Sequence, residues 1–342
     1  MRIAWFRTAA PDAADPLDDG ASLIRELSRS HQIDVIVEQQ AHDFVWQQIL
    51  NPWDLCVYEL DQSAAHAFVW AYLFNYAGVV MLRSANVAHL QAILAASRAV
   101  VTPTPEMAEM LRTTCPQAHV RTAPLAIASP PETKPQTRHQ ARVAVYDTRS
   151  HDRKLVDRAL QRARDAGAMF DHVRLDADRS LPADCDVVVA PEWPPFGRMP
   201  TATLAGMAAG KAIVTSETEV TGGWPALDPQ TWRPRDLAAT EAPIAVTIDP
   251  RDEEHSLMLA IRRLSSDPAL RTSLGDAARA WWKGHATPEH AAAAWEQILD
   301  EVTHLDPPPR PDNRPVAFSR DGSELTRDIL SEIGVRETGT VS

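Results

Sequence analysis

Polar side chains that could act on a small molecule follow two apolar segments in the first half of the chain. Residues 55–60 and 79–82 are short and apolar, which predicts two strands. In open α/β sheets ligands bind beyond the carboxyl ends of the strands, so groups after two strands can share one crevice. A packed or solvated histidine is the alternative for each imidazole here. The polar residues are Asp61, Gln62, Ser63 and His66 after the first segment, and Arg83, Ser84, Asn86 and His89 after the second.

Basic residues open the second half of the chain. Arg149, Arg153 and Lys154 stand between a predicted strand at 142–146 and a predicted helix at 154–166. A helix N-terminus carries partial positive charge and free N–H groups, so basic side chains there suit a diphosphate. A solvated basic helix face remains the alternative.

A second anion site is predicted in the stretch "APEWPPFGRMPTATLAGMAAGKAIVTSE", residues 190–217. A Pro-rich turn follows the strand at 186–190, and either Thr201 or Thr203 can cap the next helix. Small residues allow that helix to lie close to the sheet, and Gly210 is expected to end it. A compact helix–strand unit that binds nothing is the alternative.

The elements that must position these groups alternate along the chain, which predicts an α/β fold with parallel sheets covered on both faces. The expected architecture is two Rossmann-like doubly wound domains. Strands are expected at 3–6, 33–37, 55–60, 79–82, 99–102, 142–146, 172–175, 186–190, 212–214 and 245–248. Helices are expected at 21–29, 64–76, 87–97, 105–113, 154–166, 253–265, 268–282 and 288–304.

Polar, Pro-rich segments predict where the domains end. "ASPPETKPQTRHQ" contains the expected linker, residues 129–140, which separates an N-terminal domain at 1–128 from a C-terminal domain at 141–304. Residues 305–342 begin with "DPPPRPDN" and are expected to form a Pro-rich tail with a short helix near 323–333.

Composition narrows the function classes. The chain has 342 residues, is 44% hydrophobic and 23% charged, and carries a formal charge of −12. Nucleic acid is therefore not expected as a partner. No apolar run is long enough for a membrane span, no signal peptide is evident, and three scattered cysteines form no metal spacing, so a cytoplasmic protein is expected. The loop at 7–22 holds one glycine, which argues against a dinucleotide fingerprint.

Taken together, these segments resemble retaining glycosyltransferases of the GT-B fold, close to family 4. "FGRMPTATLAGMAAGKAIVTSE" is similar to the family's Phe-Gly turn and the helix after it, and residues 267–299 resemble its closing helices. The likeness extends over about residues 1–302. In the first half, the residues that match the family pattern are Tyr58, Leu60, His66, Phe68, Gly78, Val79, Val80, Leu82, His89 and Leu90.

The resemblance implies a nucleotide-sugar bound by the second domain and an acceptor presented by the first. Arg149 and Lys154 match the family's basic pair, which grips the donor pyrophosphate, and no metal or other cofactor is expected. Arg198, Thr201 and Thr203 are the further candidates for donor binding. The catalytic candidates are His66, Arg83, His89 and Glu192.

Several family positions carry other residues here. Arg83-Ser84 replaces a His-Asp pair, Asp61-Gln62 replaces Gly-Asn, and Ala205 stands where a glutamate commonly contacts the ribose. The carboxylate that precedes the Phe-Gly turn falls near Pro194, and Glu192 is the acidic residue close by. Hence two functions stay open: a glycosyltransferase, expected to act with retention, and a non-catalytic GT-B subunit that binds or scaffolds.

Partners follow from these two functions. The first predicts a nucleotide-sugar donor and a glycan, lipid or protein acceptor, and the second predicts a protein partner or a homo-oligomer. A GT-B epimerase is a third class, but it would need a pair of carboxylates in the second domain, and no convincing pair is present.

Overall fold

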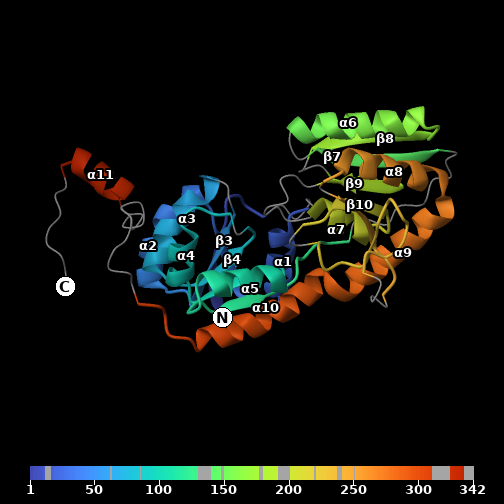
Figure 1. Cartoon of the computed structure of the whole chain (residues 1–342). Helices are drawn as coiled ribbons and strands as arrows, with labels where there is room; N and C mark the ends of the chain where they lie inside the picture. The colour runs from blue at the N-terminus through green and yellow to red at the C-terminus, as the bar shows by residue number, and fades with distance from the viewer. Residues whose placement is uncertain are drawn as a thin grey trace. The chain divides into compact units, whose positions relative to one another are not determined.

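The computed structural model describes residues 1–11, 17–61, 64–84, 86–129, 140–147, 150–176, 180–191, 201–218, 221–236, 241–249, 251–309 and 324–334 (Figure 1). The chain divides into two compact units. Unit 1 contains residues 1–11, 27–122 and 295–342, and unit 2 contains residues 12–26 and 123–294. In the described part of the chain, no helix is both long and apolar enough to cross a membrane.

Unit 1 is built on a parallel sheet with strand order β2-β1-β3-β4-β5-β6. Every residue of β3 is buried, as expected for a central parallel strand covered on both faces. The strands are β1 (Arg2–Phe6), β2 (Gln32–Ile36), β3 (Leu55–Leu60), β4 (Val79–Leu82), β5 (Ala99–Thr102) and β6 (Val120–Thr122). The helical segments are η1 (Glu38–Gln40), α2 (Ala41–Leu50), η2 (Ala64–His66), α3 (Ala67–Asn75), α4 (Leu90–Ala96), α5 (Pro105–Thr114) and α11 (Glu324–Glu332).

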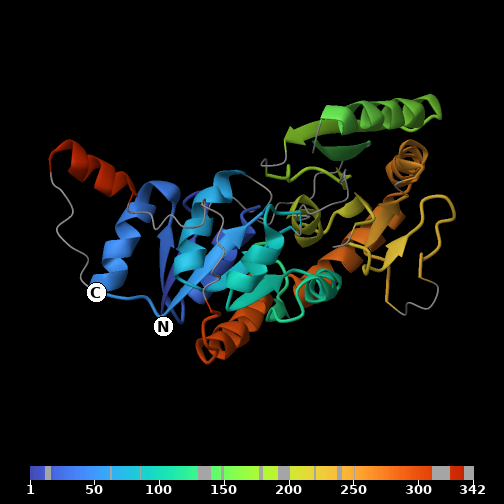
Figure 2. The ribbon, with the colours of Figure 1, turned by 60° about the vertical axis from the view of Figure 1, so that its left-hand side comes forward.

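The core of unit 1 is rich in aromatic rings. Phe6 stacks on Tyr58 at 4.8 Å between ring centroids and meets Phe44 edge-on at 4.9 Å. Such contacts add stabilisation beyond the area that each ring buries. On the alternate residue of β1, Trp5 contacts Trp295 at 5.4 Å, so the C-terminal half of α10 (Pro288–Thr303) completes the core of unit 1 (Figure 2).

Unit 2 contains a second parallel sheet, with strand order β11-β12-β10-β9-β7-β8. Alternate residues of β7, β8, β9, β10 and β12 face two apolar clusters, one with α6 and α8 and the other with α7 and α9. The strands are β7 (Ala141–Asp147), β8 (Phe170–Asp176), β9 (Val187–Ala190), β10 (Ala212–Ser216), β11 (Ala226–Leu227) and β12 (Ala245–Ile248). The helices are α1 (Asp19–Leu27), α6 (Ser150–Asp165), α7 (Thr201–Ala208), α8 (Glu253–Ser266), α9 (Pro268–His285) and the first part of α10.

Helix α7 lies unusually close to the sheet, as its small residues predict. A Cβ atom added to Gly206 would lie 2.6 Å from Ile213 Cδ1 and 3.0 Å from Val188 Cγ2. Gly210 has φ +67° and follows the end of the helix, which confirms its predicted role as the stop. The backbone of Gly210 in turn packs against Gly275 of α9, where an added Cβ would lie 2.2 Å from the Gly210 carbonyl oxygen.

The α/β prediction with two parallel sheets is confirmed, but local details differ. The helix expected at 87–97 begins at Leu90 because His89 adopts a left-handed conformation with φ 57°. The helix expected to begin at 154 begins at Ser150. Two elements of unit 1, α2 and β6, were not predicted. Most of the expected linker, residues 130–139, lies outside the described residues.

Candidate active site

The carboxyl ends of β3 and β4 bring the first group of predicted residues together. Leu60 and Leu82 are partners in the parallel ladder, and the Arg83 N–H donates to the Leu60 carbonyl oxygen at 2.9 Å. The residues after both strands therefore emerge at one edge of the unit 1 sheet, where ligands bind in open α/β folds.

Arg83 is held by a buried carboxylate that the sequence analysis did not select. Glu59, the fifth residue of β3, has a side chain only 5% exposed. Its Oε1 accepts a hydrogen bond from Trp5 Nε1 at 2.8 Å, and its Oε2 accepts one from Arg83 Nη2 at 3.1 Å. Arg7 Nε lies 3.7 Å from Oε1 and forms a second ion pair. The available signal was a charged residue inside an otherwise apolar strand, "LCVYEL".

His66 forms a separate pair with Asp61. His66 Nδ1 lies 2.7 Å from Asp61 Oδ1, and the imidazole is buried while the carboxylate is about one-third exposed. An ionised carboxylate can only accept, so Nδ1 carries the proton, and Nε2 of the neutral ring is left as an acceptor. This arrangement can orient an imidazole as a general base or as a hydrogen-bond acceptor for a hydroxyl group.

His89 lies at the start of α4 rather than inside a helix. Its ring meets Trp70 of α3 edge-on at 5.7 Å between centroids, and the residue is exposed. The preceding turn is closed by the Asn86 N–H, which donates to Ser84 Oγ at 3.1 Å. His66, Arg83 and His89 thus all lie just beyond the carboxyl ends of β3 and β4.

The structure places part of the predicted donor-binding group of unit 2. Lys154 lies in the first half of α6 and is exposed. Helix α7 begins at Thr201, so Thr203 lies inside its first turn and is not the N-cap. Thr203 is buried, and its hydroxyl has no hydrogen-bond partner among the described residues. The other predicted site residues, Arg149, Glu192 and Arg198, lie outside the described residues.

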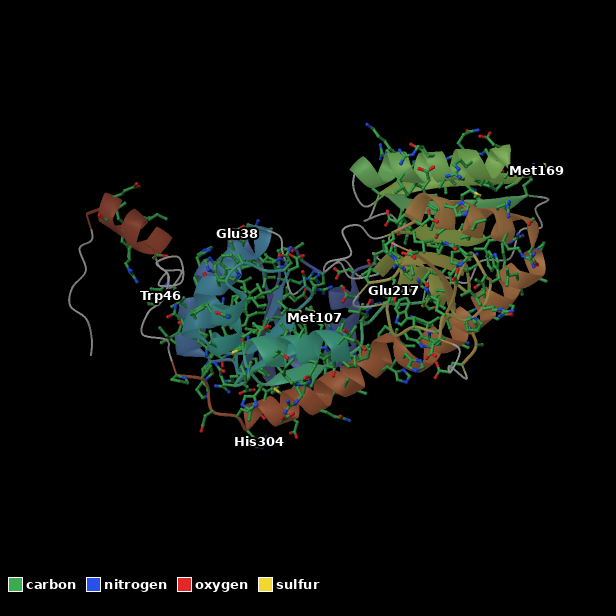
Figure 3. The ribbon with its side chains drawn as sticks, viewed as in Figure 1. Glu38, Trp46, Met107, Met169, Glu217 and His304 are labelled. Atoms are coloured by element: carbon green, nitrogen blue, oxygen red, sulfur yellow. The ribbon has the colours of Figure 1, made fainter. Side chains whose placement is uncertain are left out.

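A cavity of about 620 Å³ in unit 2 was also missed by the sequence analysis. It lies beside the carboxyl end of β10, where Glu217, labelled in Figure 3, pairs with Arg235. Thr247 of β12 lines it, and the Thr247 hydroxyl is buried without a hydrogen-bond partner in the described part of the chain. A Gly-Gly pair, Gly222 and Gly223, forms part of its wall and was the available signal.

The cysteine thiols are buried, and the described ranges hold no cluster of metal-ligand side chains. Burial raises the pKa of Cys56 and of Cys185 to about 12, so both stay protonated near neutral pH and are poor nucleophiles. Cys115 is also buried. Across the described residues, no group of three or more His, Cys, Asp or Glu side chains is arranged to hold a metal ion.

Comparison with known proteins gives the architecture a name. No protein-family profile and no curated protein sequence matches this chain. Among solved structures, Anabaena HepE in complex with UDP and glucose aligns with a TM-score of 0.60 at 11% identity, over 88% of this chain and 100% of that one. A glycosyltransferase from Rickettsia africae aligns with a TM-score of 0.60 at 10% identity, over 89% and 99% of the two chains.

Staphylococcus aureus MnaA with UDP aligns with a TM-score of 0.54 at 10% identity, over 89% of this chain and 96% of that one. At such low identity these alignments establish shared architecture, not shared side chains. The two parallel sheets and these alignments confirm the fold that the sequence predicted: the chain has the GT-B fold.

Proposed function

We propose that this protein is a glycosyltransferase that moves a sugar from a nucleotide-sugar donor to an acceptor hydroxyl. The observation that carries the proposal is the alignment with Anabaena HepE, a structure that holds UDP and glucose, over the full length of that chain. The polar groups at the carboxyl edges of both sheets are consistent with it.

Unit 2 would bind the donor. Arg149 directly precedes α6 in the sequence, and Lys154 lies in the second turn of that helix. Arg198 precedes α7 by three positions in the sequence, and Thr201 is the first residue of that helix. Two helix N-termini with basic side chains can stabilise the negative charge that develops on a leaving diphosphate. The bond between the anomeric carbon and the diphosphate oxygen breaks, and its electron pair stays on the diphosphate. No metal is needed for that role.

Unit 1 would present the acceptor. His66, oriented by Asp61, offers Nε2 as an acceptor for the hydroxyl hydrogen, and His89 adds a second, exposed imidazole. Arg83, held by Glu59, supplies a fixed positive charge. The acceptor oxygen bonds to the anomeric carbon, and its proton leaves to a base or to the departing diphosphate. Retention at that carbon, with Glu192 as the nearby carboxylate, is the stereochemical outcome we propose.

A non-catalytic binding subunit is the second candidate, and the buried surface of α7 favours it. Ala205 stands where the family that this sequence resembles has a carboxylate. It lies in an apolar cluster of unit 2 and is 3% exposed. A hydrocarbon side chain in that place offers no hydrogen bond to a ribose. Such a subunit would still bind a nucleotide through α6 without transferring a sugar.

Thermal unfolding with nucleoside diphosphates and nucleotide-sugars tests both candidates. A ligand at about 100 times its Kd adds about 2.7 kcal/mol to the native state, which is roughly 5–11 °C for a unit of this size. Lys154→Ala should reduce that shift, whereas Lys283→Ala, which removes an exposed lysine from α9, should not.

Diphosphate release with an acceptor panel then separates the candidates. A shift together with acceptor-dependent release supports the transferase. A shift without release for any acceptor supports the binding subunit. The absence of a shift with every nucleotide at millimolar concentration contradicts both.

A further inference from the structure

Exposed apolar side chains are concentrated on two helices of unit 1. Among the described residues, nine large hydrophobic side chains are exposed, and six of them belong to α2 or to the end of α11. Single exposed hydrophobics are ordinary on protein surfaces, but clusters mark contact sites. The six residues are Trp46, Ile49, Leu50, Ile329, Leu330 and Ile333.

The exposed cluster on α2 forms a ridge on its outer face. Ala41 and Phe44 face the core and are buried. Trp46, Ile49 and Leu50 are 55%, 68% and 84% exposed, and their i, i+3 and i+4 spacing places them on one face. The structure therefore leaves an apolar ridge of unit 1 uncovered at this helix.

Helix α11 carries a matching ridge. Ile329 and Leu330, with Ile333 one residue beyond the helix, are 51%, 37% and 69% exposed. Spacings of three and four residues again place them side by side. Two such ridges can interdigitate when helices pack.

The chain that leads to α11 starts beside α2. Pro307, Pro308 and Pro309 line a cavity of about 340 Å³ together with Gln48 of α2 and the ring of Trp53. Fourteen residues, 310–323, then connect to α11. A segment of this length spans on the order of 45 Å when extended, whereas α2 is about 15 Å long. The tether is therefore long enough for α11 to reach the outer face of α2.

We propose that α11 docks on the outer face of α2 of the same chain. A short tether gives α11 an effective concentration on the order of millimolar at that face, which favours its own α2 over the α2 of a second copy. The docked helix would hold the Pro-rich segment against the amino edge of the unit 1 sheet, opposite the candidate active site. An anionic membrane is a poor match, because "ELTRDILSE" is acidic and α2 contains no lysine or arginine.

Cross-linking tests the contact and its partner at once. The native cysteines are buried, so a chain with Leu50→Cys and Ile329→Cys can be treated with a short bismaleimide under native conditions. The expected product has the mass of a monomer at every protein concentration. Its yield should exceed by at least about tenfold that of a Met110→Cys and Ile329→Cys control, because Met110 is exposed on α5 of the same unit.

Two outcomes would overturn the proposal. Cross-linked dimers whose yield rises with concentration would assign the face to a second copy. Equal yields for the two cysteine pairs would show that α11 has no preferred contact.

Trp46 provides a second readout that does not depend on cysteines. Ile329→Glu with Ile333→Glu should shift the emission of the full chain to longer wavelength by exposing the Trp46 ring. The same double change in a Trp46→Phe background should leave the emission unaltered. An equal shift in both backgrounds would contradict burial of Trp46 by α11.

Discussion

Replacing Glu59 by alanine probes the buried network at the carboxyl edge of the unit 1 sheet. The change removes a carboxylate that accepts from Trp5 and Arg83 and pairs with Arg7, whose side chain is 9% exposed. Breaking a buried ion pair by removing one partner costs about 3–5 kcal/mol. Because Arg7 and Arg83 have further interactions, we expect the lower end of that range, about 3 kcal/mol. Glu59→Gln should cost less, because its amide oxygen can still accept from Trp5.

Amide hydrogen exchange measures this effect in one unit at a time, which a single melting curve of a two-unit chain does not. A loss of about 3 kcal/mol speeds the slowest exchange in β1 and β3 by roughly 150-fold, since 1.36 kcal/mol is tenfold. Strands β9 and β10 of unit 2 serve as the internal reference. Glu109→Ala is the matched control, because it breaks an exposed pair with Arg112 that should contribute less than about 1 kcal/mol.

If Glu59→Ala changes exchange in β1 and β3 no more than Glu109→Ala does, the Glu59 carboxylate does not stabilise unit 1 as proposed. That result would mean that solvation of the two guanidinium groups compensates for the lost carboxylate. A double-mutant cycle with Trp5→Phe then isolates the free energy of the Trp5–Glu59 hydrogen bond. That free energy exceeds the value typical of an exposed hydrogen bond only if water is excluded from the site.

Three further predictions follow from packing and ionisation. Gly206→Ala should destabilise unit 2 by about 1–3 kcal/mol through overpacking against the sheet, whereas Gly284→Ala in α9, where nothing lies within 4 Å, should stabilise it by about 0.5–1 kcal/mol. Amide hydrogen exchange in β9 and β10 compares the signs of these two changes within unit 2. Burial raises the pKa of Cys185 to about 12, so the unfolded chain loses this proton first, and stability should fall between about pH 9 and 12. Denaturant titrations with and without Cys185→Ala check this, and equal slopes against pH would contradict it. The hydrogen bond from Arg121 lowers the pKa of Glu301, so its contribution should be present above about pH 4.5 and disappear as pH falls through the lowered pKa. Both side chains are over a third exposed, so Glu301→Gln should cost under about 1 kcal/mol at neutral pH in urea unfolding.

The central strands could be predicted because a strand that is buried on both faces requires apolar residues at nearly every position. "VVVA" is a continuous apolar run and "LCVYEL" is apolar except for Glu59; both segments end in turn signals, and both form buried strands. The stop at Gly210 was predictable for a similar reason, since a positive φ is strained for any residue with a Cβ.

Helix α2 escaped prediction because its outer face is only partly polar. Trp46, Ile49 and Leu50 are exposed on the same helix as His42 and Asp43, so the usual 3.6-residue alternation of apolar and polar residues is blurred. The same side chains carry the proposed contact with α11.

Long-range partners were beyond any local pattern. Trp5 and Glu59 are 54 positions apart in sequence, and His31 reaches Glu296 across 265 positions. The grouping of α1 with unit 2 and of the C-terminal half of α10 with unit 1 depends on the same kind of distant packing. Three site candidates, Arg149, Glu192 and Arg198, fall outside the described residues, so their placement stays a prediction.

An identity near 10% over an almost complete alignment means that backbone architecture is shared while side chains are free to differ. The proposed chemistry must therefore come from this chain's own groups. In unit 1 those groups are unusual in kind: a guanidinium, Arg83, emerges where two strands end, and a buried carboxylate in the same strand pair fixes it. A cation held in this way cannot abstract a proton, because arginine stays protonated in proteins. It can orient or neutralise an anionic group. The imidazole of His66 is therefore the group better suited to accept the hydrogen of the hydroxyl that receives the sugar.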